Sequence, residues 1–162
     1  MAALEKLIRY VGFFTAAVLA LLILLVVYDA SMRYLFQSGS IALQELEWHL
    51  FDVVILFGIA YALQTGMHVR VDIFYERFSA KTKAVVDLIA ALFFILPFCA
   101  LIIYVGFDFV MISFEQMEAS SNPGGLPYRF IVKAVMPLAF VLLALQALSE
   151  SVSAYRRIRS AL

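Results

Sequence analysis

The sequence is poor in the residues that build most catalytic and cofactor sites, with one cysteine and two histidines among 162 residues. A single cysteine can form neither a disulfide nor a cysteine metal cluster within the chain. His49 and His68 would lie about 28 Å apart along one helix, so they cannot ligate one haem iron within a subunit. The sequence also lacks a phosphate-cradling glycine loop. We therefore expect no enzyme activity, no cofactor and no bound metal.

Charge is also scarce, and apolar residues take its place. Charged residues make up 15% of the chain, hydrophobic residues 65%, and the mean hydropathy is +0.98. Soluble domains are nearer to about 45–50% apolar. So much apolar surface cannot be hidden inside a chain of this length, so it must face lipid.

Four apolar segments are long enough to cross a bilayer, which takes about 20 helical residues. They cover residues 10–28, 47–64, 84–112 and 130–148. Their composition shows no two-residue alternation, which favours helices over barrel strands. The sequence thus predicts an all-α membrane protein, one integral domain over residues 1–162, with a tilted bundle of four helices and a long third helix.

Prolines mark special points of these helices. Pro97 and Pro137 lie inside the third and fourth segments, where each should kink its helix. Pro127 stands where the fourth helix is expected to begin, and a first turn tolerates proline.

The basic residues predict the orientation of the chain. Nine of the twelve lie before the first segment, between the second and third, or after the fourth, and only Arg33, Arg129 and Lys133 lie on the other side. Because basic residues concentrate on the cytoplasmic side, both termini are expected in the cytoplasm.

The second segment carries an ionisable face at its start. Glu45, His49 and Asp52 are spaced i, i+4, i+7 and share one side of a helix. Such groups either sit at the headgroup level, where Trp48 is a typical anchor, or face protein. Sequence alone leaves both interpretations open, although Asp52 lies roughly 10 Å deeper than Glu45 and more strongly requires a polar partner.

Small residues line a different side of the same segment. Gly58, Ala62 and Gly66 recur every four residues, and Gly12 begins a similar series in the first segment. Small residues at this spacing allow helices to approach closely. Two distinct faces predict that the second helix lies between two neighbours.

The stretch MHVRVDIFY, residues 67–75, follows the second segment. Its alternating apolar and charged residues are typical of a membrane interface. His68 and Asp72 lack a third ligand nearby, which argues against a structural metal site. The stretch can serve as a topology signal or as a contact that fixes the connection between helices.

The order and spacing of these features resemble the small Q-type (DctQ-like) membrane subunit of tripartite ATP-independent periplasmic (TRAP) transporters. The residues that carry the resemblance are Arg33–Tyr34, Glu45 with Gly58 thirteen positions on, the run from His68 to Asp72, Pro127 and Pro137. The stretch SSNPGGLPYRFIVKAVMPLAFVLLALQ further resembles the mannitol or chloroaromatic branch.

The resemblance implies partners. In such systems a large multi-span (M-type) subunit of the inner membrane moves sodium and an organic acid, and a periplasmic binding protein delivers the acid. The small subunit braces the large one, helps to dock the binding protein and binds neither substrate nor sodium. Nucleic acid is not an expected partner.

The same resemblance suggests contact residues. The candidates for the subunit interface are Arg33, Glu45, Trp48, His49, Asp52, Gly58, His68, Arg70 and Asp72. The candidates for contact with the binding protein are Glu115, Glu118, Asn122 and Tyr128. We also predict an ion pair between Arg33 and Glu45 across the first loop. The main alternative is a homo-oligomeric four-span channel, which would need a continuous polar stripe.

Overall fold

The computed structural model describes residues 2–66 and 78–160, which form long helices and no strand within these ranges. The helices are α1 (Ala2–Leu35), α2 (Ile41–Gln64), α4 (Ala80–Ala90), the π-helical turn η1 (Ala91–Ile95), α5 (Leu96–Glu115) and α6 (Phe130–Ser160). Because α4, η1 and α5 are continuous, they form the predicted long third helix. The described residues therefore contain four helices long and apolar enough to cross a membrane, which confirms the predicted fold class. Each predicted segment lies inside one of them.

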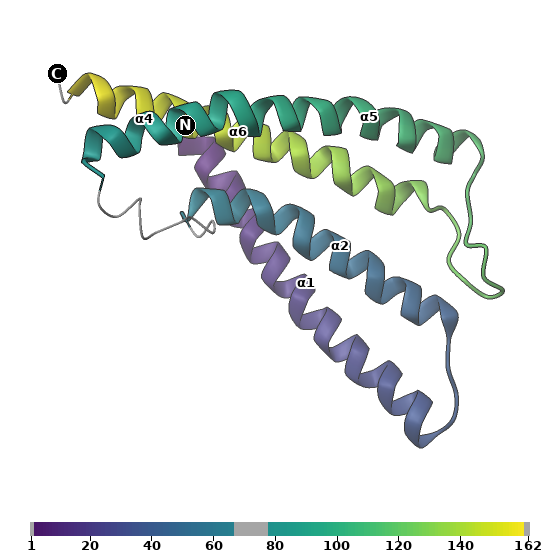
Figure 1. Cartoon of the computed structure of the whole chain (residues 1–162). Helices are drawn as coiled ribbons and strands as arrows, with labels where there is room; N and C mark the ends of the chain where they lie inside the picture. Colours follow the sequence, from purple (N-terminus) through teal and green to yellow (C-terminus); the bar gives the residue numbers. More distant parts are fainter. Residues whose placement is uncertain (1, 67–77, 161–162) are drawn as a thin grey trace.

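The helices form two hairpins that share one seam. Helix α1 packs on α2, α5 packs on α6, and α2 joins the hairpins by packing on α6 (Figure 1). The hairpins diverge toward the end that carries the α1–α2 and α5–α6 loops, which we call the loop end. Both termini lie at the opposite, terminal end. Helix α2 thus lies between two neighbours, as its two faces predict.

Small residues make the contact between α1 and α2. A Cβ atom added to Gly12 would lie 2.5 Å from Cδ2 of Tyr61, so the α2 ring occupies the space that a side chain would take. Gly58 of α2 faces Thr15 of α1 with more room, 3.8 Å from its methyl carbon. One glycine from each predicted stripe, Gly12 and Gly58, therefore lies in the contact between α1 and α2.

The third helix changes its winding just before Pro97. Proline lacks the N–H that would continue the α-helical ladder. The N–H of Leu96 donates to the carbonyl oxygen of Ala91, five residues back, at the end of the π-helical turn. The kink expected at Pro97 thus coincides with a π turn, a common site of helix irregularity.

Helix α6 begins later than the proline signal predicts. Its first residue is Phe130, so Pro127 lies in the preceding loop. Tyr128 has φ of +58°, a left-handed conformation that is incompatible with a continuing right-handed helix. Pro137 lies inside α6, as predicted, against the buried Gly106 of α5.

Many large apolar side chains are exposed. The accessible area is 10779 Å², whereas a compact soluble monomer of this mass would expose about 8,100 Å². Four aromatic side chains of a kind typical of membrane interfaces, Tyr10, Trp48, Tyr104 and Tyr128, are all exposed. An open layer of helices leaves broad apolar faces for lipid or for a larger partner.

Candidate functional site

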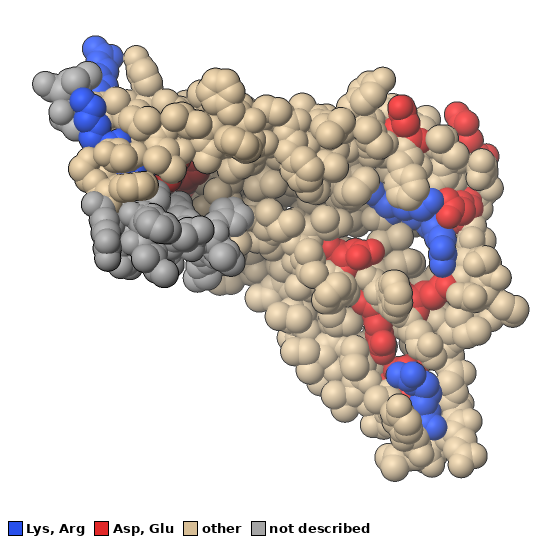
Figure 2. Space-filling view, viewed as in Figure 1, with Lys and Arg blue, Asp and Glu red and all other residues tan. Residues whose placement is uncertain are grey.

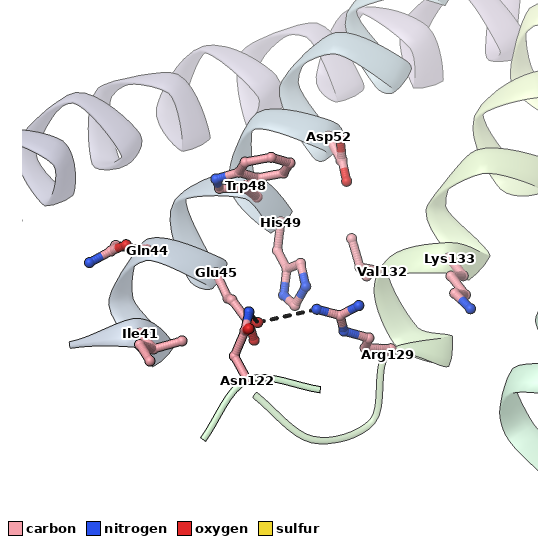
Figure 3. Close-up of a pocket in the computed structure, with 10 residues that line it drawn as sticks. All are labelled: Ile41, Gln44, Glu45, Trp48, His49, Asp52, Asn122, Arg129, Val132 and Lys133. Atoms are coloured by element: carbon pink, nitrogen blue, oxygen red, sulfur yellow. Dashed lines mark hydrogen bonds and ion pairs between the residues drawn. The ribbon is translucent and has the colours of Figure 1, made fainter. Parts of the chain in front are cut away.

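A groove opens between α2 and α6 at the loop end (Figure 3). Its volume is about 400 Å³. It is lined by Ile41, Gln44, Glu45, Trp48, His49, Asp52, Asn122, Arg129, Val132 and Lys133. It therefore brings the predicted ionisable face of α2 together with the start of α6 and the loop before it. Acidic and basic side chains gather at this end of the molecule in Figure 2.

Glu45 is the centre of this site. The capping hydroxyl of Ser40 fixes the start of α2 five residues earlier, and the Glu45 side chain points toward the α5–α6 loop. Its carboxylate is only 13% exposed. It accepts hydrogen bonds from Leu126 N at 2.7 Å, Arg129 Nη2 at 3.1 Å, Asn122 Nδ2 at 3.4 Å and Ser120 Oγ. One carboxylate of α2 thus fastens the loop of residues 116–129 to the other hairpin.

The α5–α6 loop also closes on itself. Ser120 N donates to Leu126 O at 3.0 Å, and Arg129 N donates to Glu118 O at 2.8 Å. Met117 and Gly124 have positive φ values of 44° and 79°. These bonds and turns give the loop a defined shape to which the Glu45 carboxylate is fitted.

A second ion pair ties this loop to α6. Glu118 pairs with Lys133, whose ammonium also lies 4.1 Å from the centre of the Phe109 ring. The hydrogen bond and positive charge of Lys133 hold the pKa of Glu118 below its ordinary value. Because the folded-state pKa is depressed, the pair stabilises the loop above the ordinary glutamate pKa. That contribution is lost as the pH falls through the lowered value.

The remaining polar residues of the groove are open to their surroundings. Trp48 is 75% exposed, Asp52 is exposed, and His49 is half-buried. Figure 3 shows His49 and Asp52 on the side of α2 that faces α6. Within the part of the chain that the structure describes, neither residue has an ion pair. The groove therefore combines a carboxylate bonded within the chain, that of Glu45, with an exposed one that has no ion pair among the described residues, that of Asp52.

Comparison with protein-family models matches residues 22–157 to the tripartite ATP-independent periplasmic transporters, DctQ component. The match covers most of the chain. The chain belongs to the DctQ family. It is therefore the small component of a TRAP transporter, a transport subunit and not an enzyme. A comparison with curated proteins finds no match.

The DctQ component does not form the predicted ion pair between Arg33 and Glu45. Arg33 Nε lies 2.8 Å from Asp29 Oδ2, one turn earlier in α1, and Glu45 pairs with Arg129. The prediction is wrong because α1 continues to Leu35, where we expected a loop. A helix places residues four positions apart side by side, so Asp29 reaches Arg33 first.

Several polar partners in the DctQ component were missed from sequence. Arg129 and Lys133 anchor the loop, and Asp29 is fully buried between the helices. Near it, Glu47 keeps one buried carboxylate oxygen without a hydrogen-bond partner among the described residues. A count of opposite charges at the loop end would have found the two basic residues, because only three lie on that side of the predicted membrane.

The other predicted contact residues of the DctQ component divide into two groups. Gly58 faces α1 within the chain, so the contact that the structure shows for it is intramolecular. His68, Arg70 and Asp72 lie outside the described residues. The assignments of these residues to an interface with the large subunit stay predictions.

Gly125 is expected to be intolerant of a side chain. An added Cβ would lie 2.5 Å from Ser120 Cβ and 2.7 Å from Glu45 Oε2, so Gly125→Ala should push the loop off the carboxylate. Limited proteolysis of the loop should then become about tenfold faster. Gly124→Ala is the matched control, because its Cβ would meet nothing within 4 Å and only its φ of +79° is strained. Equal rates for the two variants would contradict the close fit between Gly125 and the carboxylate.

Proposed function

We propose that the chain is the stationary scaffold subunit of a sodium-driven TRAP transporter for organic acids. In this role it braces the large membrane subunit, which moves the substrate, and its loop end helps to dock the periplasmic binding protein. The Glu45 network carries the proposal, because it joins the two hairpins and holds the α5–α6 loop in one shape. A stator and a docking platform both require such rigidity.

The orientation follows from the basic residues at the two ends. The terminal end contains Lys6, Arg9, Arg156, Arg157 and Arg159, whereas the loop end contains three basic residues. The positive-inside rule then places both termini in the cytoplasm of a bacterial or archaeal cell and the loop end in the periplasm. This orientation presents the α5–α6 loop to a periplasmic partner.

Bracing is supported by the open layer of helices. A chain that leaves broad apolar faces and encloses little chemistry is better suited to packing beside a larger subunit than to transporting a solute. The long helices and the exposed aromatic anchors resist tilting in the bilayer. A moving partner needs such a fixed neighbour.

Docking is supported by the residues that the loop leaves available. Glu115, Asn122 and Tyr128 are exposed, and Glu118 is half-exposed beside Lys133. Their backbone positions are set by the closed loop, so a partner would bind them without the entropic cost of ordering the segment.

The proposal is tested by sodium-driven uptake into proteoliposomes. The large subunit and binding protein are reconstituted with the chain, without it, or with the Glu45→Ala variant. We expect uptake to require the chain and to be reduced in the variant. Equal uptake by the large subunit alone would contradict the scaffold role.

Asp52 is expected to contribute to the contact with the large subunit. Its exposed carboxylate lies within the membrane-crossing helix α2, where a charge requires a polar or cationic partner. Asp52→Asn should lower the yield of the assembled complex about tenfold. Asp108→Asn is the matched control, an exposed aspartate on α5. The expectation fails if both variants assemble as well as the parent chain.

A further inference from the structure

A second cavity lies at the terminal end, where the start of α1, the end of α2 and the second half of α6 meet. Its volume is about 360 Å³. Unlike an apolar packing defect, it is lined by polar and charged side chains, among them Glu5, Arg9, Gln146 and Glu150. The site at the loop end does not include any of these residues, so the cavity is separate from it.

Gln146 makes the cavity a candidate binding site. Its side chain is only 1% exposed, and it lies in the cavity wall. Its Nε2 donates to Glu150 Oε1 at 3.1 Å, but its buried Oε1 has no hydrogen-bond partner among the described residues. A buried acceptor without a hydrogen bond is unfavourable, so a donor from a molecule bound in the cavity would stabilise this atom.

The charges around Gln146 are of both signs. Arg9 lines the cavity from α1 and has no ion pair in the part of the chain that the structure describes. Glu150 lines the cavity from α6, and Glu5 lies one turn before Arg9 in α1. The cavity therefore offers a cation for an anionic group, together with a carboxylate and an amide oxygen for an ammonium group.

The depth of the cavity matches the surface of a bilayer. The apolar part of α1 begins directly after Arg9, with the exposed Tyr10, and α2 ends at Gln64 beside the cavity. Side chains at the ends of membrane-crossing helices lie at the level of the lipid headgroups. A headgroup is thus the zwitterionic molecule present there at the highest concentration.

We propose that this cavity binds a phospholipid headgroup that carries a primary ammonium beside its phosphate. The ammonium donates hydrogen bonds to Gln146 Oε1 and to Glu150, and the phosphate pairs with Arg9. A bound lipid would join the start of α1 to α6, where the two helices make few direct contacts. The inference depends on membrane insertion of the chain and not on which solute the transporter moves.

The test is lipid retention by the intact complex with its large subunit. The complex is reconstituted with phosphatidylethanolamine or phosphatidylcholine, and native mass spectrometry counts the lipids kept by the released chain. Phosphatidylcholine has the same phosphate, but its trimethylated nitrogen cannot donate a hydrogen bond. We expect about tenfold greater retention of phosphatidylethanolamine. Equal retention of both lipids would overturn the proposal.

Variants of the chain test which of its side chains bind the ammonium and the phosphate of the lipid. Gln146→Leu, which removes the acceptor at similar volume, should lower the retention of phosphatidylethanolamine to that of phosphatidylcholine. Arg9→Gln should lower the retention of both lipids. Gln44→Leu, the same change in the groove at the loop end, should alter neither. If Gln146→Leu retains phosphatidylethanolamine like the parent chain, water satisfies the amide and the cavity is not a headgroup site.

A soluble competitor distinguishes a lipid headgroup from a soluble molecule that carries the same ammonium and phosphate groups. Phosphoethanolamine at a concentration equal to that of the lipid should not displace it, because the acyl chains add binding energy in the bilayer. Displacement would assign the cavity to a soluble amine phosphate and overturn the lipid assignment.

Discussion

Replacing Glu45 with alanine is expected to release the α5–α6 loop from α2. The carboxylate accepts four hydrogen bonds from the loop and its flank, and no other side chain of α2 replaces it. Its loss leaves the Leu126 N–H without an acceptor and the Arg129 guanidinium without its ion pair, and unpaired donors in partly buried sites are unfavourable. Amide hydrogen exchange over residues 118–129 should become about tenfold faster.

A pair of further variants sharpens this prediction. Glu45→Gln keeps the length of the side chain and one acceptor oxygen but loses the charge, so its exchange rate should lie between those of Glu45→Ala and the parent chain. Glu115→Ala is the control, an exposed glutamate at the end of α5. Unchanged exchange in Glu45→Ala would show that the loop holds its shape without α2.

Gly12→Ala is expected to destabilise the packing of α1 on α2 strongly. The new Cβ would lie 2.5 Å from Tyr61 Cδ2 and 2.7 Å from its Cγ, so it meets the base of a ring rather than a movable end. The hairpin of α1 and α2 must open or the ring must leave the contact. Overpacking of this kind costs about 1–3 kcal/mol. The free energy of unfolding by titration with SDS measures this cost.

Two other glycines provide controls for Gly12. Gly58→Ala adds a methyl group to the same interface with 3.8 Å of room, so its free energy of unfolding should match that of the parent chain. Gly106→Ala meets the terminal methyl of Met136 at 3.1 Å, and a flexible methionine can move away. Equal losses of unfolding free energy in all three variants would indicate a general cost of removing glycine. They would contradict a specific clash with Tyr61.

The sequence predicts the helices well because their signals are local. Apolar length and the absence of alternation place four membrane-long helices, and the two faces of α2 correctly predict two neighbours. These patterns depend on lipid as the surrounding solvent, which acts on every segment alike. The exposed tyrosines and Trp48 are also predictable, because aromatic side chains at the ends of apolar segments are typical of membrane interfaces.

The ion-pair partners of charged residues are harder to predict from the sequence than the helices, as Glu45 shows. Its position on a polar face was evident, but its partner depends on how a loop far along the chain folds back. Arg33 is the nearest cation in sequence, yet the extra turns of α1 give it Asp29, and the loop brings Arg129 to Glu45. Gly125 similarly comes close to Ser120 and Glu45 only when the loop closes over the carboxylate, so its close contact cannot be predicted from the sequence.

The structure also differs from the sequence predictions at helix ends and irregular turns. Pro127 is compatible with a first helical turn, but the left-handed Tyr128 postpones α6 to Phe130. Pro97 predicts a disturbance without saying which kind, and the structure resolves it as a π turn. Both outcomes depend on backbone hydrogen bonds to neighbours that periodicity does not encode.

The most direct test of the scaffold role is co-purification of the tagged chain with its large membrane subunit. Both are expressed together, and the mass of the purified assembly gives the ratio of the two chains. We expect a complex with one copy of the chain for each large subunit, and no ion conductance from the chain alone. A homo-oligomer of the chain that conducts ions without the large subunit would contradict the scaffold role.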